Sequence, residues 1–176
     1  MGSGYLTYHG VRKDYSVFKA RSDGSLTEVT AEMLDGITTI GGIAFYGCHS
    51  LKSIIIPNSV RSIQMSAFSS CSSLKSVTLP SSLTIIDESA FSYCGALTSV
   101  TIPSSVTSIK GYVFNYCASL ASVTVEATTP PTLGNNVFQG THTDLVIYVP
   151  SESVETYKAA SGWSNYASKI QAIPST

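Results

Sequence analysis

The chain has 176 residues, which is enough for one domain with a hydrophobic core. Only 12% of its residues are charged, and ten basic against eleven acidic side chains give a net charge of −1. Because the sequence contains no basic run, it lacks the source of counterion release that drives nucleic-acid binding, and nucleic acid is excluded as a partner. No apolar stretch approaches the roughly 18 residues that cross a bilayer, and the first residues lack the charged-then-apolar pattern of a secretory leader.

Residues 1–36 are expected to form an N-terminal cap. Residues 5–30 alternate weakly between apolar and polar side chains around Asp23-Gly24, a pair suited to a tight turn. This pattern predicts a hairpin over the first coil of the repeats that follow, and that first coil is expected to be partial.

Residues 37–143 repeat with a step of 23 residues. The repeat is visible in columns of equivalent residues: Phe45, Phe68, Phe91 and Phe114; Cys48, Cys71, Cys94 and Cys117; Leu51, Leu74, Leu97 and Leu120; Ile54, Val77, Val100 and Val123; Pro57, Pro80 and Pro103. A repeated unit of this length cannot bury its own apolar side, so the columns predict a solenoid of stacked coils.

One unit, residues 88–110, shows the expected local structure. The spacing of Phe91, Cys94 and Leu97 places them on one side of a short helical stretch. Val100 and Ile102 alternate with polar residues, which indicates a half-buried strand. Pro103 then turns the chain into a second extended segment.

Residues 144–176 are expected to form a C-terminal cap. Residues 145–150 predict a last strand, and Ser151 can cap a helix through about Ala160. Trp163, Tyr166 and Ile170 would then cover the open apolar end. The whole of residues 1–176 is interpreted as a single domain without an internal linker.

The sequences Leu51–Ile56 and Leu74–Leu79 match the start of a leucine-rich repeat, and they are followed by a proline turn and by Ala-Phe-x-x-Cys at residues 67–71 and 90–94. This combination closely resembles the BspA-like, treponemal-type leucine-rich repeat of bacterial surface proteins over roughly residues 37–150. Residues 144–173 also look like a C-terminal cap common in such proteins. The resemblance implies an α+β repeat solenoid, export, and display at the cell surface or outside the cell.

Three interpretations of the cysteine column remain open. A zinc site is disfavoured because its ligands converge from short pairs, whereas these thiols lie on separate coils. Disulfides between neighbouring coils have a suitable separation but a poor torsional geometry. We favour a column of buried free thiols. His9, His49 and His142 are scattered over loops, and no nucleophile elbow, phosphate loop or paired-carboxylate motif occurs, so no catalytic, cofactor or metal site is predicted.

Two surfaces are candidate binding sites. Tyr93 and Tyr116 occupy equivalent positions in adjacent coils with Tyr112 nearby, although they could instead pack flat over the joints between coils. Thr78, Thr101 and Thr124 form an outward row beside a row of serines, a hydroxyl ladder that could present hydrogen-bonding groups to a glycan or an extended peptide. Such a row is also what an ordinary exposed strand would show.

We therefore expect a non-enzymatic binding module that recognises a protein or glycan in adhesion, with host extracellular matrix among the candidate partners. This expectation rests on the family resemblance, since fold alone does not determine function. The alternative is a structural spacer that displays another domain of a larger surface protein.

Overall fold

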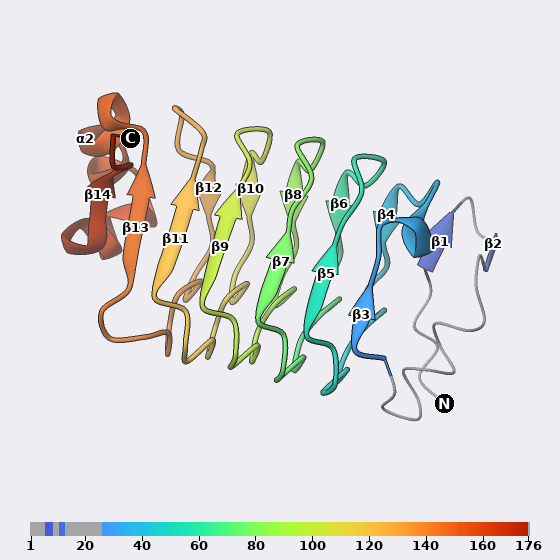
Figure 1. Ribbon diagram of the computed structural model, residues 1–176. Helices are drawn as coiled ribbons and strands as arrows, with labels where there is room; N and C mark the ends of the chain where they lie inside the picture. The colour runs from blue at the N-terminus through green and yellow to red at the C-terminus, as the bar shows by residue number, and fades with distance from the viewer. Residues whose placement is uncertain (1–5, 9–10, 13–25, 176) are drawn as a thin grey trace.

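The computed structural model describes residues 6–8, 11–12 and 26–175. They form a solenoid in which each coil contributes one strand to each of two opposed faces (Figure 1). The front face in Figure 1 carries two sheets, in the orders β3-β5-β7 and β14-β13-β11-β9, and the opposite face carries one sheet in the order β12-β10-β8-β6-β4-β1-β2.

The strands are short, and the regular helices are confined to one N-terminal turn and the C-terminal cap. The elements are β1 (Leu6–Tyr8), β2 (Val11–Arg12), β3 (Glu28–Val29), η1 (Glu32–Leu34), β4 (Thr39–Ile40), β5 (Ser53–Ile55), β6 (Ser62–Ile63), β7 (Ser76–Thr78), β8 (Ile85–Ile86), β9 (Ser99–Ile102), β10 (Ser108–Ile109), β11 (Ser122–Val125), β12 (Thr132–Leu133), β13 (Val146–Val149), η2 (Ser151–Ser153), α2 (Val154–Ala159), η3 (Trp163–Lys169) and β14 (Ile170–Ala172).

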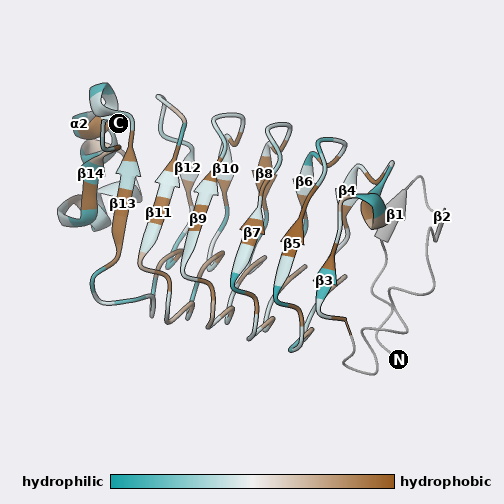
Figure 2. Ribbon diagram, viewed as in Figure 1, coloured by the Kyte–Doolittle hydropathy of each residue, from teal (hydrophilic) through white to brown (hydrophobic). Residues whose placement is uncertain are grey.

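The predicted columns become stacks in the core. The rings of Phe45, Phe68, Phe91, Phe114 and Phe138 lie face to face, with successive centroids 5.0–5.9 Å apart. Stacking follows from parallel pairing in register, for example Val100 with Val123, because equivalent residues then lie one strand spacing apart. Figure 2 shows apolar and polar residues recurring from coil to coil. The repeat solenoid predicted from the sequence is confirmed.

The predicted short helical stretch around Phe91 is wrong, because the segment folds as consecutive turns. Ser89 and Tyr93 adopt φ of 57° and 59°, and a left-handed residue interrupts a right-handed helix. The amide of Phe91 donates to the carbonyl of Val113 in the next coil (3.0 Å) instead of to a carbonyl one turn back. Bonding between coils therefore replaces bonding within a helix.

The ladder of parallel strands begins before residue 37, because β3 already pairs in parallel with β5. At the same end, β1 pairs antiparallel with both β2 and β4, so β1 covers the edge of the parallel ladder at β4 and β2 is the end strand of the sheet. The hairpin turn predicted at Asp23-Gly24 lies outside the described residues.

The C-terminal cap differs from the prediction in one detail. Ser151 does not cap the helix: its hydroxyl donates to Glu152 (3.2 Å), and α2 begins after η2. As predicted, Trp163 and Ile170 are buried over the last coil, and Tyr166 is partly buried against the core. The Trp163 Nε1–H donates to the Pro131 carbonyl (2.7 Å), which fixes the cap on the turn of the last repeat.

Candidate functional site

Tyr93 and Tyr116 are brought together on the turn edge of the solenoid, which we define as the Ala-Phe-x-x-Cys turns and the residues just before them. Their ring centroids are 5.1 Å apart and their planes differ by 16°, so the rings stack. Both side chains remain about half exposed, at 53% and 48%. The two rings therefore pack across the joint between their coils, as the alternative holds, and each side chain still keeps about half of its surface in solvent.

Tyr116 also rests on the last coil. A Cβ atom built on Gly140 would lie 2.6 Å from Tyr116 Cδ1, so the ring lies directly against the glycine backbone. One ring face of Tyr116 is covered by Tyr93 and the other by Gly140. This ring can therefore offer a partner its edge and its hydroxyl group, but not a free face.

The three tyrosines adopt left-handed backbone conformations, with φ of 59° at Tyr93, 61° at Tyr112 and 55° at Tyr116. Left-handed conformations cost a non-glycine residue about 1–2 kcal/mol, and bulky residues adopt them rarely. Each coil has two such positions. One is occupied by Gly47, Ser70, Tyr93, Tyr116 and Gly140, and the other by Ile43, Ser66, Ser89, Tyr112 and Asn136.

Tyr112 thus belongs to a different column from the stacked pair. It lies four residues before Tyr116 in the same coil and is 39% exposed. Its amide donates to the carbonyl of Asn135 in the last coil (2.9 Å), so its backbone is held although its side chain is in solvent. The structure therefore places Tyr112 on the same edge but outside the ring stack.

Sequence reasoning missed three further apolar side chains on this edge. Ile43, Tyr46 and Met65 are 45%, 54% and 54% exposed, and Ile43 is another left-handed residue. The signal that could have found the strained positions is the presence of glycine at both ends of the Tyr93 and Tyr116 column. Glycine adopts positive φ without steric cost, so its recurrence in one column indicates that conformation for the whole column.

The three candidate threonines lie on the front face, where their side chains point outward. Thr101 pairs in register with Thr124 through β9 and β11, and Ser99 pairs with Ser122. Thr78 belongs to the other sheet, where it pairs with Ile55. The hydroxyl ladder is therefore interrupted between Thr78 and Thr101, and both residues line a groove of about 330 Å³ at the interruption.

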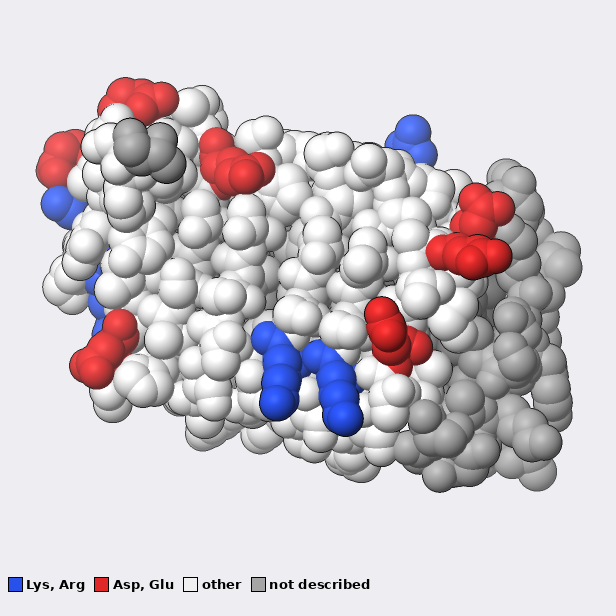
Figure 3. All heavy atoms as spheres, in the orientation of Figure 1, with Lys and Arg blue, Asp and Glu red and all other residues white. Residues whose placement is uncertain are grey.

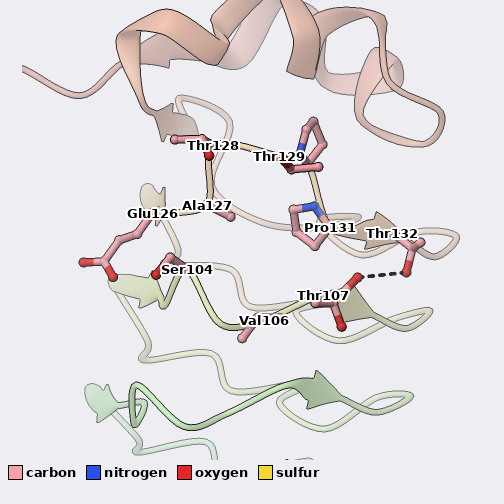
Figure 4. A pocket seen from close by; sticks show the side chains of 10 residues that line it. Ser104, Val106, Thr107, Glu126, Ala127, Thr128, Thr129, Pro131 and Thr132 are labelled. Carbon is pink, nitrogen blue, oxygen red and sulfur yellow. Dashed lines mark hydrogen bonds between the residues drawn. The ribbon is translucent and has the colours of Figure 1, made fainter.

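A second hollow, of about 400 Å³, lies between the proline turn of residues 103–107 and the longer turn of residues 126–132. Its walls are mostly methyl groups and proline rings, and the Thr132 hydroxyl donates to the Thr107 carbonyl at one side (3.4 Å; Figure 4). The Glu126 carboxylate points away from this hollow. Its lining holds five hydroxyl groups, but no histidine, lysine or cysteine that could activate them.

The four cysteines are buried free thiols. Cys71, Cys94 and Cys117 donate to the carbonyls of Phe45, Phe68 and Phe91, at 3.1–3.2 Å. A side-chain hydrogen bond with Cys117, together with burial, holds the pKa of the Cys94 thiol well above its usual value. A thiol kept protonated is a poor nucleophile and a poor metal ligand, which fits a packing role.

The described histidines are held in local contacts on loops. His49 Nδ1 lies 3.3 Å from the Ser72 hydroxyl, and His142 Nδ1 accepts a hydrogen bond from the Asp144 amide (3.2 Å). His9 lies outside the described residues. Within the described part of the chain, no group of three or more His, Cys, Asp or Glu side chains is arranged to hold a metal ion.

The parallel ladders, the proline turns and the stacked Phe and Cys columns define a leucine-rich-repeat protein. The model of the BspA type leucine rich repeat region matches residues 16–156 with six copies, and the chain belongs to this family. Leucine-rich-repeat domains generally mediate protein interactions. Among curated proteins, none matches the sequence significantly.

Solved structures agree with the family. The T. pallidum leucine-rich-repeat protein TpLRR is 32% identical, with a TM-score of 0.63 over 71% of this chain and 58% of its own. A leucine-rich-repeat protein from Bacteroides ovatus is 25% identical, with a TM-score of 0.54 over 84% of this chain and 42% of its own. The pneumococcal vaccine antigen PcpA shares the fold, at 17% identity and a TM-score of 0.60 over 86% of this chain and 42% of its own. The chain thus spans about half the length of these relatives.

No helix among the described residues has the length and apolar character to cross a membrane.

Proposed function

We propose that this chain is a non-enzymatic recognition module of a secreted or cell-surface protein, and that it binds a protein partner in adhesion through the turn edge around Tyr93, Tyr112 and Tyr116. The family supports the general role, because its repeats serve as interaction scaffolds. A component of the host extracellular matrix is the first partner to test.

The observation that carries the proposal is the combination of backbone strain and exposure at these tyrosines. Their left-handed conformations cost free energy, and about half of each stacked ring stays in water. The stacking of Tyr93 on Tyr116 stabilises the fold by about 0.5–1.5 kcal/mol, which is less than the cost of the strain at both residues. The amide hydrogen bonds of these tyrosines to the next coil hold the strained backbones, and residues held in this way are concentrated at functional sites.

The geometry favours a protein partner over a sugar at this edge. A pyranose stacks its apolar face on an open aromatic face, and Tyr116 offers none because Tyr93 and Gly140 cover it; Tyr93 has at most the one face on the side of Ser70. The exposed ring edges and hydroxyl groups instead suit the mixed apolar and hydrogen-bonding contacts in which tyrosine is enriched at protein interfaces.

The test is binding of the purified domain to an immobilised panel of host matrix proteins. The variant is Tyr93→Ser/Tyr116→Ser, because Ser70 already occupies the equivalent left-handed position and the fold accommodates serine there. The matched control is Ile55→Ala, an equally exposed side chain on the front face, away from the turn edge. Saturable binding that weakens at least tenfold in the double variant and is unchanged in the control supports the proposal.

Saturable binding that the double variant leaves unchanged would refute the tyrosine edge as the site. Absence of binding to the whole panel would favour the alternative function, a spacer that displays another domain. A solenoid suits that role because its coils stack along one direction.

A further inference from the structure

A second site, separate from the turn edge, lies between β7 and β9 on the front face. Every other pair of neighbouring described strands on this face is joined by a parallel ladder, whereas β7 and β9 belong to different sheets. Between β5 and β7, the Lys75 amide donates to the Lys52 carbonyl and the Ile56 amide donates to the Thr78 carbonyl. Across β7 and β9 the described residues form neither equivalent hydrogen bond.

The missing bonds involve the Thr98 amide with the Lys75 carbonyl and the Leu79 amide with the Thr101 carbonyl. The equivalent bonds of the neighbouring coils indicate that these groups lie on the sides of the two strands that face each other. Backbone donors and acceptors left without protein partners require hydrogen bonds from water or from a ligand. The opposite face has no such break, since β8 pairs with β10 in register.

The floor of the gap is more open than the equivalent strand positions of the neighbouring coils. Val77, Leu79 and Val100 are 9%, 8% and 4% exposed, whereas the equivalent Ile54 and Val123 are at 1% and 0%. The groove of about 330 Å³ lies here, with Ser76, Thr78, Ser99 and Thr101 among its lining residues. Each hydroxyl group both donates and accepts hydrogen bonds.

The two ends of the groove carry opposite charges. Lys75 immediately precedes Ser76 at the start of β7, and Lys52 is its neighbour in the preceding coil. Glu126 lines the groove at the other end, where it replaces the proline found at position 103. Figure 3 shows two basic side chains next to each other on the front face, and acidic side chains at several other places on that face, one of them beside the pair.

The lysine pair has an electrostatic cost. Like charges at neighbouring positions of a sheet repel each other. The ion pair found among the described residues joins Lys158 to Glu155 in the C-terminal cap and involves neither Lys52 nor Lys75. Glu28 pairs with Ser53, next to Lys52, on the side away from the groove, so an anion in the groove would lie beside Lys75.

We propose that the groove between β7 and β9 binds an acidic oligosaccharide, whose sugar hydroxyls bond to the serine, threonine and open backbone groups and whose anionic substituent lies at the Lys75 end. Sugar hydroxyls match a lining that needs donors and acceptors together. The anionic substituent is a carboxylate or a sulfate, and it lies away from Glu126 because like charges repel.

An extended peptide fits the groove less well. A peptide strand adds to an open sheet edge, and it needs about 4.8 Å of free width on its side of that edge. The strands β7 and β9 remain neighbours in the stack of coils, so no strand can be inserted between them. A sugar can instead lie over the groove from outside.

The test is isothermal titration of the domain with an oligogalacturonate (carboxylate), a chondroitin sulfate oligosaccharide (sulfate) and maltotetraose (neutral). The groove variant is Thr78→Val/Thr101→Val, which removes two hydroxyls and keeps the strand-favouring branched shape. The matched control is Thr124→Val, in the same row but outside the groove lining. Lys75→Gln and Glu126→Gln test the charges, and circular dichroism confirms the fold of each variant.

The expected result is saturable binding of at least one acidic oligosaccharide and much weaker binding of maltotetraose. The groove variant should bind about tenfold more weakly, the effect of two ordinary hydrogen bonds, while Thr124→Val stays within about twofold. Lys75→Gln should weaken binding and Glu126→Gln should strengthen it.

The proposal is overturned if neither acidic oligosaccharide binds better than maltotetraose, or if the groove variant and Thr124→Val behave alike. The Tyr93→Ser/Tyr116→Ser variant should bind the acidic oligosaccharide normally. This control separates the two proposals, because loss of protein binding without loss of oligosaccharide binding locates two independent sites.

Discussion

Replacement of Phe91 by alanine tests the stacked core most directly. The Phe91 side chain is fully buried between Phe68 and Phe114, with ring centroids at 5.1 Å and 5.7 Å. Its backbone is bonded to the next coil, so the coils cannot collapse freely into the space that the ring leaves. The truncation therefore creates a cavity in the middle of the ring column.

The magnitude follows from burial and stacking together. Truncation of a buried phenylalanine to alanine costs about 3–5 kcal/mol. Two ring pairs are lost, each worth about 0.5–1.5 kcal/mol beyond area burial, so we expect a loss of about 4–5 kcal/mol, near the top of that range. For a domain of this size each kcal/mol lowers the Tm by roughly 2–4 °C.

The assay is urea unfolding followed by circular dichroism, with Tyr46→Ala as an exposed control that should stay within about 0.5 kcal/mol of the parent. The slope of the transition should not change if the variant still unfolds in one step. A loss below about 1.5 kcal/mol for Phe91→Ala would refute the stacked column as the core of the coils, since it is less than the smallest cost of a buried aromatic truncation.

Three further predictions follow from the same packing. A thiol-reactive dye should label the native protein slowly and reveal four thiols in denaturant; fast native labelling would contradict their burial. Gly134→Ala should destabilise by about 1–3 kcal/mol in urea, because its Cβ would overlap the Gly111 amide nitrogen, whereas Gly95→Ala should be nearly neutral. Burial raises the pKa of Tyr157, so stability should be constant below the unfolded-state pKa near 10 and fall as the pH rises above it; Tyr157→Phe should abolish that fall in pH-dependent unfolding.

The sequence predicted the architecture of the coils because equivalent residues occupy the same structural position in every coil. The spacing of Phe68, Phe91 and Phe114 indicated one shared interior column, and the structure stacks these rings. When coils pair in parallel and in register, a side chain that recurs with a constant step can be buried in few places other than one shared column. The end of the solenoid was predictable for the same reason, since Trp163 and Ile170 had one open apolar surface to cover.

The sequence did not reveal the local backbone. The i, i+3 spacing of Phe91 and Cys94 is shared by a helix and by consecutive turns, and the bonding between coils selected the turns. Ser151 met the requirements of a helix cap, but η2 precedes α2 and moves the helix start. The Ser153 hydroxyl at the actual start donates to the Thr128 carbonyl (2.8 Å), a partner that only the stacked coils bring near.

For the candidate sites too, the sequence predicted one part and only the tertiary structure gave the rest. The sequence alone determined which side chains recur on one surface, because a fixed step places Tyr93 beside Tyr116 and Thr101 beside Thr124. Only the tertiary structure decided that the tyrosines are strained, that both faces of Tyr116 are covered, and that the threonine row is broken beside Thr78. Periodicity determines which coils are neighbours, whereas the fit between neighbouring coils depends on backbone angles and contacts that no residue encodes by itself.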